Sequence, residues 1–125
     1  MLYKNLLISL ILVLASLIPN VIEIKSSELD QILDIGREKL LESDFKGALK
    51  EFNNVIKDNP KIWQAFQYRG ISKYRLKNYK GALKDFNRAI EINPNNLLLL
   101  NYRALTNMEL GNIDDSINDI NLYLS

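Results

Sequence analysis

Apolar residues follow two different patterns along this chain. From Leu6 to Ile18 they form an almost continuous run that only Ser9 and Ser16 interrupt. Beyond residue 28, polar residues separate the apolar positions, as in helices that expose one face. We therefore expect an apolar N-terminal segment followed by six helices, with approximate spans 28–42, 46–58, 62–76, 80–92, 96–110 and 114–124.

The part of the chain after residue 28 also repeats itself every 34 positions. The five residues Lys46–Lys50 recur letter for letter as Lys80–Lys84. A fixed period of this length indicates a repeat array, in which each unit buries its apolar face against its neighbour. The positions that share the period are Gly36, Gly70 and Ala104; Ala48, Ala82 and Ser116; Phe52, Phe86 and Ile120; and Pro60 and Pro94.

This repeat resembles the tetratricopeptide repeat, in which each unit is a pair of antiparallel helices. The second unit, 63–96, matches best and reads like the common bacterial subtype; the first, 29–62, and the third, 97–125, keep fewer positions. The resemblance implies an all-α tetratricopeptide-repeat solenoid of three antiparallel helix pairs, the third incomplete, preceded by an apolar N-terminal helix. In the second unit it rests on Tyr68, Arg69, Gly70, Tyr74, Leu76, Tyr79, Ala82, Asp85, Phe86, Asn87, Ala89, Ile90, Asn93 and Pro94.

Most residues that share the period are expected to serve the fold. Small residues such as Gly70 and Ala82 lie where paired helices approach closely, and large ones such as Phe86 fill the space beside them. Ala82→Leu would overpack such a contact at a cost of about 1–3 kcal/mol. We assign a structural role to Gly36, Ala48, Phe52, Pro60, Gly70, Ala82, Phe86, Ala89, Pro94 and Ala104.

The helix boundaries carry recognisable capping residues. Ser27 and Asp30 resemble a capping box at the start of the first repeat helix. Asn59–Pro60 and Asn93–Pro94 are expected to supply a cap and a first-turn proline to the helix that opens the next unit. The second helix of each unit should be capped at its N-terminus by Asp44, Asn78 and Asn112 respectively.

Two interpretations of the N-terminal segment, residues 1–25, stay open. It is typical of a secretory signal, with Val13 and Ala15 as the small residues before a cut after Ala15. It also suits an uncleaved signal anchor, because Leu6 to Ile22 would span about 25 Å of a hydrocarbon core about 30 Å thick, with Lys4 favouring a cytoplasmic N-terminus. A buried core helix fits less well, since apolar residues cover all its sides. We expect an exported or membrane-anchored protein whose repeat domain is 26–125.

The composition argues against several kinds of catalytic and metal-binding site. The chain has no cysteine and no histidine, so it lacks the thiol nucleophile and the usual general base near neutral pH. The neighbouring carboxylates Asp114 and Asp115, like Asp30 and Asp34, lie where helix starts favour acidic residues. No glycine-rich phosphate loop, nucleophile elbow or metal-ligand spacing occurs. We therefore expect a non-catalytic protein without a metal or another cofactor.

Charge is uneven along the repeats, although the whole chain carries only +1. Residues 61–88 contain eight basic residues and one acidic residue, which gives +7, whereas 23–60 carry −3 and 89–125 carry −4. This pattern favours a solvated outer face with attraction between neighbouring units. A basic band that binds an acidic peptide or acidic lipid headgroups is the alternative. Nucleic acid is not expected, because no recognition motif accompanies the basic residues.

The resemblance also implies a binding surface, since the first helix of each unit lines a concave groove in this family. The positions that match the groove are Asp30, Leu33, Asp34 and Arg37 in the first unit; Gln64, Gln67, Tyr68, Ile71, Tyr74 and Arg75 in the second; and Leu98, Asn101, Tyr102, Leu105 and Met108 in the third. Amides pair with peptide backbone, tyrosines offer flat apolar area, and an arginine binds a carboxylate. We select Arg37, Gln64, Gln67, Tyr68, Ile71, Arg75, Asn101, Tyr102 and Leu105 as the candidate partner-binding residues.

One departure from the family argues against one class of peptide ligand. Members that grip a chaperone's C-terminal carboxylate use lysine and asparagine on the groove face of the first unit, where this chain has Leu33 and Arg37. That ligand class is therefore not expected.

The predicted function is a protein–protein interaction module that binds an extended peptide or a partner helix and helps assemble a membrane or envelope complex. The alternative is a structural homo-oligomer. It would assemble through the last helix, whose apolar residues Ile113, Ile117, Ile120, Tyr123 and Leu124 have no further repeat to cover them.

Overall fold

The computed structural model describes the backbone of residues 2–125 and the side chains of 2–10, 13 and 27–125. All secondary structure in the described chain is helical. The chain divides into two compact parts, Met1–Gln31 and Ile32–Ser125. This confirms the predicted all-α class. The helices are α1 Leu2–Leu41, α2 Phe45–Asp58, α3 Trp63–Arg75, α4 Tyr79–Ile92, α5 Leu97–Leu110 and α6 Ile113–Leu124.

The N-terminal part of the chain, up to Gln31, consists of the first portion of α1. The helix runs without a break from Leu2 to Leu41, so the prediction that a capping box at Ser27 starts a separate helix was wrong. Most side chains of the predicted signal or anchor segment, 1–25, lie outside the described residues. Among the residues that are described, no helix is both long enough and apolar enough to cross a membrane.

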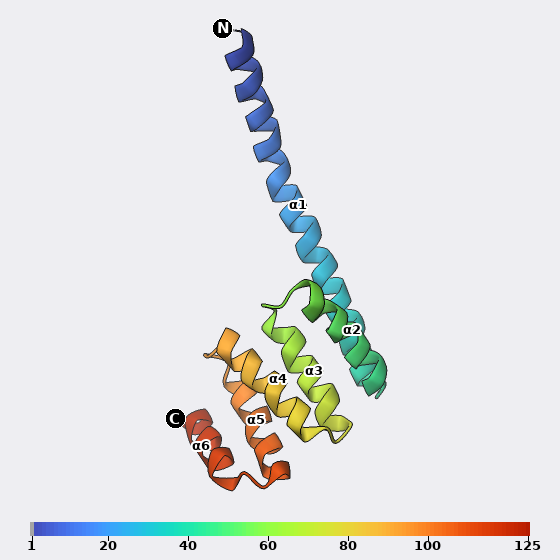
Figure 1. Ribbon diagram of the computed structural model, residues 1–125, viewed down its shortest axis with the longest axis vertical. Helices are drawn as coiled ribbons and strands as arrows, with labels where there is room; N and C mark the ends of the chain where they lie inside the picture. Colours follow the sequence, from blue (N-terminus) through green and yellow to red (C-terminus); the bar gives the residue numbers. More distant parts are fainter. Residues whose placement is uncertain (1) are drawn as a thin grey trace. The chain divides into compact units, whose positions relative to one another are not determined.

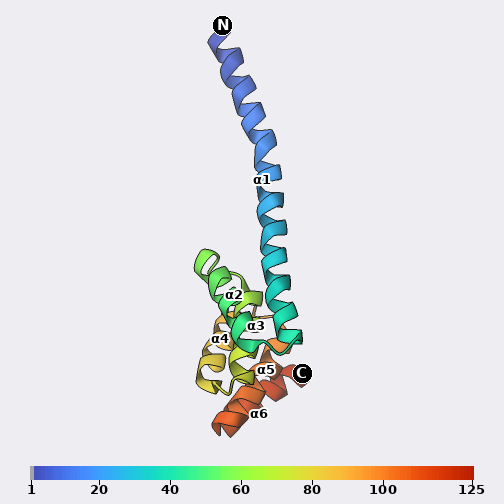
Figure 2. The same ribbon diagram turned by 90° about the vertical axis from the view of Figure 1, so that its right-hand side faces the viewer.

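In the C-terminal part, Ile32–Ser125, the helices from α2 onward pack in chain order, each against the next, and α1 contacts α2 through Gly36 and Lys39 (Figures 1 and 2). The last ten residues of α1 pair with α2, α3 pairs with α4, and α5 pairs with α6. Short connections make each pair antiparallel. The helices α3 and α5, which open successive units, also touch each other. The observed bounds from α2 onward agree with the predicted spans within one residue, because turn residues mark every break.

Glycine allows close packing within the first two helix pairs. A Cβ atom at Gly36 would lie 2.5 Å from Cζ of Phe52, and one at Gly70 would lie 2.8 Å from Cε1 of Phe86. Both phenylalanine side chains are completely buried. In the third unit the equivalent pair is Ala104 and Ile120, so a larger residue at the glycine position accompanies a smaller partner. The predicted structural role of these positions agrees with this packing.

Stacked aromatic rings join one unit to the next. The ring of Tyr68, on α3, lies 5.4 Å from that of Phe52 on α2. One period later, Tyr102 on α5 lies 5.5 Å from Phe86 on α4. Each phenylalanine therefore contacts the glycine of its own unit on one side and the tyrosine of the following unit on another.

The turn within each unit has the same backbone conformation. Ser43, Lys77 and Gly111 have positive φ angles of 63°, 61° and 78°, although only glycine adopts this region without strain. The amide of the following residue donates to the carbonyl of the residue five positions before it, as from Asn78 to Lys73 at 2.8 Å. This bond closes the end of the first helix in a Schellman-type cap.

Two of the predicted N-caps are confirmed. The side chains of Asp44 and Asn78 accept hydrogen bonds from the amides of Gly47 and Gly81 at 2.9 and 3.0 Å. Asn112 also occupies the N-cap position but makes no such bond.

The predicted role of the asparagine–proline pairs was wrong. Asn59 and Asn93 end α2 and α4 as C-caps, and the residues that precede α3 and α5 are Ile62 and Asn96. Pro60 and Pro94 therefore lie in the connecting turns, where a missing amide costs nothing.

Candidate binding groove

A hollow of about 250 Å³ lies along α3 and α5. Its lining is mainly apolar, and it has an arginine and two tyrosines among its residues. Two first helices of successive units form it, because the 34-residue period places equivalent faces of α3 and α5 next to each other. The lining residues are Ile71, Tyr74, Arg75, Phe86, Tyr102 and Leu105.

The apolar part of the hollow is firmly held. Phe86 is fully buried, and Tyr102 stacks on its ring. Leu105, one turn further along α5, is 42% exposed. An apolar side chain of a ligand would therefore contact Tyr102, which Phe86 supports from behind, and remove Leu105 from water.

Arg75 supplies a positive charge beside this apolar surface. Its side chain is exposed, and its guanidinium lies 5.5 Å from the ring centre of Phe45. No ion-pair partner for Arg75 occurs among the described residues. Because the guanidinium rests on an aromatic ring, it stays near the hollow with its donors free for a carboxylate.

Another part of the lining lies beside a negative charge, that of Glu109. The hydroxyl of Tyr74 donates to Oε1 of Glu109 at 3.4 Å, and its ring lies edge-on to Tyr79 at 5.2 Å. Burial, followed by the charge of Glu109, raises the pKa of Tyr74 above its ordinary value of 10.0. Tyr74 therefore remains a neutral hydrogen-bonding group at physiological pH.

Four of the nine predicted binding residues line this hollow together: Ile71, Arg75, Tyr102 and Leu105. Phe86 was assigned to the fold alone, yet it also lies directly behind the lining, fully buried, where it supports Tyr102. The 34-residue period gave no sign of this second role, because a residue buried between helices and one at the base of a groove share the same apolar character.

The remaining predicted residues lie elsewhere. Gln67 is only 5% exposed, so the prediction that its amide faces a ligand was wrong. Arg37 pairs with Asp34 at 2.9 Å, and its guanidinium lies 5.8 Å from the ring centre of Tyr68. Gln64 and Asn101 are half-buried and, like Arg37 and Tyr68, do not line the hollow.

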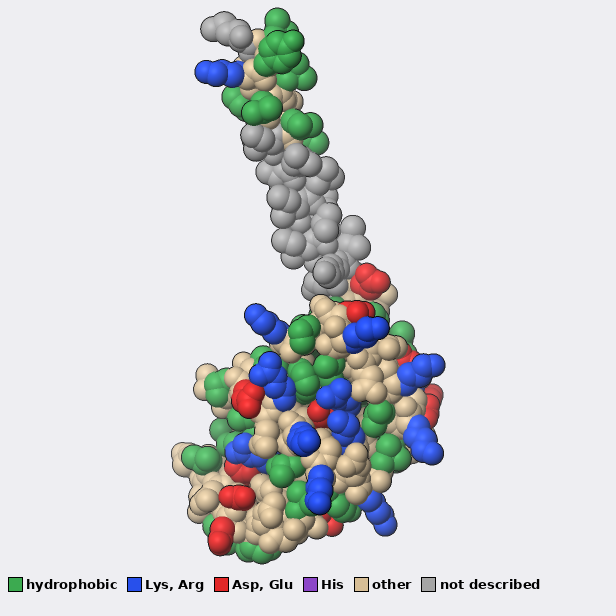
Figure 3. Space-filling view, in the orientation of Figure 1, with side chains coloured by type: hydrophobic (Ala, Val, Ile, Leu, Met, Phe, Trp, Pro, Cys, Tyr) green, Lys and Arg blue, Asp and Glu red, His purple; other side chains and the backbone are tan. Residues whose placement is uncertain are grey.

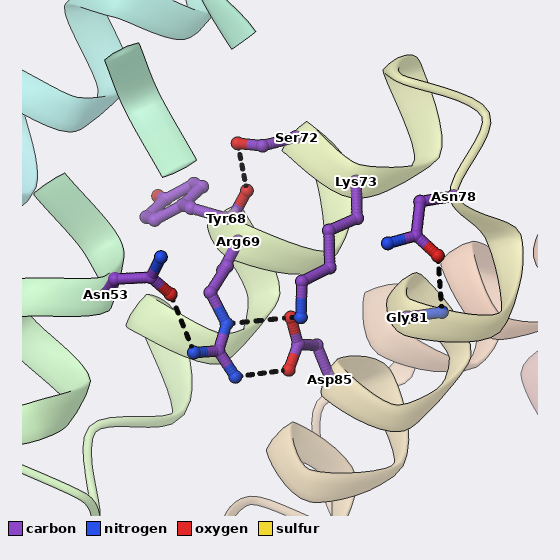
Figure 4. Close-up of polar contacts among 8 residues, drawn as sticks. All are labelled: Asn53, Tyr68, Arg69, Ser72, Lys73, Asn78, Gly81 and Asp85. Carbon is purple, nitrogen blue, oxygen red and sulfur yellow. Dashed lines mark hydrogen bonds and ion pairs between the residues drawn. The ribbon is translucent and has the colours of Figure 1, made fainter. Parts of the chain in front are cut away.

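Part of the basic band is internal. Asp85 is 3% exposed, and its carboxylate accepts two hydrogen bonds from Arg69, at 2.6 and 2.9 Å, while Lys73 lies 2.8 Å away (Figure 4). The third guanidinium nitrogen of Arg69 donates to Asn53 of the preceding unit at 2.9 Å. Two of the eight cations in 61–88 therefore have a structural counter-ion, and they connect three helices.

The same arrangement recurs one period later. Arg103 donates to Asp119 at 2.5 and 2.8 Å and to Asn87 at 3.0 Å. The hydrogen bonds to Asp119 raise the pKa of Arg103 above its ordinary value. This recurring arginine was not predicted as a contact, although both arginines precede their aspartates by 16 residues.

Other cations of the band are exposed. Figure 3 shows lysine and arginine side chains gathered over the middle of the C-terminal part, Ile32–Ser125. Among the described side chains, Lys61, Lys77, Lys80 and Lys84 are exposed and have no acidic partner within ion-pair distance. The band thus combines an internal structural part with a solvated part.

Comparison with known proteins supports the tetratricopeptide repeat. Residues 63–96 match the tetratricopeptide repeat family model, while no curated protein matches this chain. The second TPR of Spaghetti (RPAP3), bound to the HSP90 peptide SRMEEVD, superposes with a TM-score of 0.74 at 18% identity, covering 77% of this chain and 89% of that one. The TPR2B domain of yeast Sti1, in a pHsp70 complex, gives 0.73 at 21% identity with 76% of both chains covered.

A further solved structure, MamA, superposes with a TM-score of 0.72 at 14% identity, covering 77% of this chain and 56% of MamA. Identities this low show the fold alone. Together with the repeated helix pairs, these matches show that residues 63–96 are a tetratricopeptide repeat and that the chain has the fold of a tetratricopeptide-repeat solenoid.

Proposed function

We propose that this protein is a non-catalytic interaction module that binds an extended segment of a partner protein in the hollow between α3 and α5. The observation that carries the proposal is the juxtaposition of an apolar hollow with the free guanidinium of Arg75. The second TPR of Spaghetti is described bound to an HSP90 peptide and the TPR2B domain of Sti1 in a pHsp70 complex, which supports peptide binding as a use of this architecture.

The chemistry of the hollow indicates which segment would bind. An apolar side chain would occupy the space beside Leu105 and Tyr102, and a neighbouring carboxylate would pair with Arg75. A basic ligand is disfavoured at Arg75, because like charges repel each other. The preferred segment therefore has an aliphatic or aromatic residue next to an aspartate or glutamate.

The N-terminal segment adds a location to this proposal. We infer that residues 1–25 direct export or anchor the chain, so that the repeat domain meets partners at a membrane or in an envelope compartment. Anchoring would raise the effective concentration of membrane-bound partners and would suit assembly of a membrane complex. Carbonate extraction of membranes from cells expressing the full chain or residues 26–125 tests anchoring, and the mass of the mature protein tests cleavage after Ala15.

A site-specific crosslink tests the groove directly. A photo-reactive residue at position 105 should capture a partner in cells, whereas the same residue at position 84, which is exposed on α4 outside the hollow, should not. Arg75→Glu should abolish the crosslink at position 105. Equal capture from both positions, or capture unaffected by Arg75→Glu, would contradict the proposal. Circular dichroism and thermal unfolding must first show that the variants are folded.

A further inference from the structure

The outer face of α6 lacks the cover that its two counterparts have. Within the repeat, Ile120 and Asn121 occupy the positions of Phe86 and Asn87 on α4 and of Phe52 and Asn53 on α2. Both phenylalanines are completely buried, whereas Ile120 is 37% exposed. The difference continues one turn later, where Tyr123 and Leu124 are 45% and 74% exposed.

The two covered examples show what this face binds within the chain. On α2, Phe52 receives the ring of Tyr68, and Asn53 accepts a hydrogen bond from Arg69. On α4, Phe86 receives Tyr102 and Asn87 accepts from Arg103. In both cases the covering helix carries a tyrosine followed directly by an arginine. The apolar contact and the amide–guanidinium hydrogen bond thus occur together on the same helix face in both repeats.

We propose that the outer face of α6 is a second docking surface, distinct from the groove, for a partner helix that carries adjacent aromatic and arginine residues. The aromatic ring packs on Ile120 and Tyr123, and the carbonyl oxygen of Asn121 accepts from the arginine. Asn121 is exposed and has no hydrogen-bond partner for its side chain among the described residues.

A second copy of this chain is a poorer occupant. In a head-to-tail stack, the first repeat helix of the second copy would cover α6, and Asp34 and Ile35 occupy the tyrosine and arginine positions there. A carboxylate would then lie against Ile120, and no guanidinium would reach Asn121. The charge and hydrogen bonding of the surface therefore favour a helix other than the first repeat helix of this chain.

A synthetic helix supplies the probe. A side-chain-stapled, fluorescently labelled peptide with the sequence of residues 96–110 carries Tyr102 and Arg103 and lacks the rest of the fold. It should bind the full-length protein, and the same peptide with Arg103→Gln should bind at least about tenfold more weakly, because a hydrogen bond to a charged group is lost. Fluorescence anisotropy measures both affinities.

Variants of the protein locate the binding site. Asn121→Ala should weaken binding of the arginine peptide to the level of the glutamine peptide and leave binding of the glutamine peptide unchanged, since the two changes remove one interaction. Asn54→Ala, a matched exposed asparagine on α2, should leave both affinities unchanged. Leu105→Glu should also have no effect, which separates this surface from the proposed groove.

Three results would overturn the proposal. The first is equal affinity for the arginine and glutamine peptides, and the second is additive loss in the Asn121→Ala variant. The third is a rise in mass with protein concentration, in sedimentation experiments, that Asn121→Ala removes, because this would identify a second copy as the occupant. Each is measurable on the folded full-length protein, because the side chain of Asn121 is exposed and makes no hydrogen bond to the described residues.

Discussion

The guanidinium of Arg69 holds both oxygens of the Asp85 carboxylate, with Nη2 2.6 Å from Oδ1 and Nε 2.9 Å from Oδ2. The pair crosses from α3 to α4 within one unit, and the same arginine reaches Asn53 in the preceding unit. Asp85 is almost completely removed from water. A buried charge of this kind is tolerated because two cations pair with it and its oxygens accept hydrogen bonds.

Removing this carboxylate should destabilise the fold strongly. Asp85→Ala leaves Arg69 and Lys73 close together and without their counter-ion, and we expect a loss of roughly 2–4 kcal/mol in the free energy of unfolding. Urea denaturation followed by circular dichroism measures it. The control is Glu91→Ala, which breaks an exposed pair with Arg88 and should cost less than about 1 kcal/mol. Similar effects of the two substitutions would show that Asp85 does not hold the helices together.

The 34-residue period was sufficient to predict the helices and their packing partners. Glycine at positions 36 and 70 and phenylalanine at 52 and 86 have few uses other than close helix contact, so pattern alone identified them. The arginine–aspartate pairs were equally periodic but were not recognised, because a charged residue in a repeat reads as solvent-exposed unless its partner is sought at a second fixed spacing.

The groove was only partly predictable. Ile71 and Arg75, which lie one helical turn apart on α3, both line the hollow. Gln67 belongs to the same stripe by spacing, yet neighbouring helices bury it. The spacing of residues in one helix fixes the direction in which their side chains point. Their exposure depends on side chains from other units that are distant in sequence.

A methyl group at Gly70 should conflict with Phe86. The added Cβ would lie 2.8 Å from Cε1 of that ring, so Gly70→Ala should lower stability by about 1–3 kcal/mol through overpacking. Phe86→Leu in the same protein should reduce this penalty, because a smaller side chain frees the space, as Ile120 does opposite Ala104. A double-mutant cycle measured by thermal unfolding gives the coupling. Additive losses would show that the two residues do not compete for space.

The turn at Lys77 should improve when it becomes glycine. Its φ angle of 61° is in the left-handed region, which costs a residue with a Cβ about 1–2 kcal/mol, partly offset by the greater freedom of glycine in the unfolded chain. We expect Lys77→Gly to raise stability by roughly 0.5–1 kcal/mol and Gly111→Ala to lower it by a similar amount. Lys77→Ala, which retains the Cβ, is the control and should have little effect in chemical denaturation.

Ser116 occupies an alanine position. It is 2% exposed, its hydroxyl has no hydrogen-bond partner among the described residues, and the equivalent residues are Ala48 and Ala82. Ser116→Ala should raise the free energy of unfolding by about 1–2 kcal/mol, since burying an unpaired hydroxyl is unfavourable. Ser72→Ala should not stabilise the protein, because the Ser72 hydroxyl donates to the carbonyl of Tyr68 at 2.8 Å. A destabilised Ser116→Ala variant would mean that the hydroxyl is satisfied in solution.

The raised pKa of Tyr74 makes stability depend on pH in the alkaline range. Above pH 10 the unfolded chain loses the phenolic proton while the folded chain keeps it, so the folded state binds more protons. The stability that this tyrosine contributes is therefore complete below its unfolded pKa and is lost as the pH rises through its folded pKa. Unfolding free energies measured from about pH 9 to about pH 11 should fall more steeply for the natural protein than for Tyr74→Phe.

The two largest causes of this shift are separable at Glu109. Burial is the larger cause, and the carboxylate adds to it. Glu109→Gln should therefore lower the pKa of Tyr74 but leave it above 10, as followed by NMR titration of a ¹³Cζ-tyrosine label. The same substitution removes a negative charge near the hollow, so it should also strengthen binding of an acidic ligand at Arg75. A pKa that does not change in Glu109→Gln would show that the tyrosine and the carboxylate do not interact in solution.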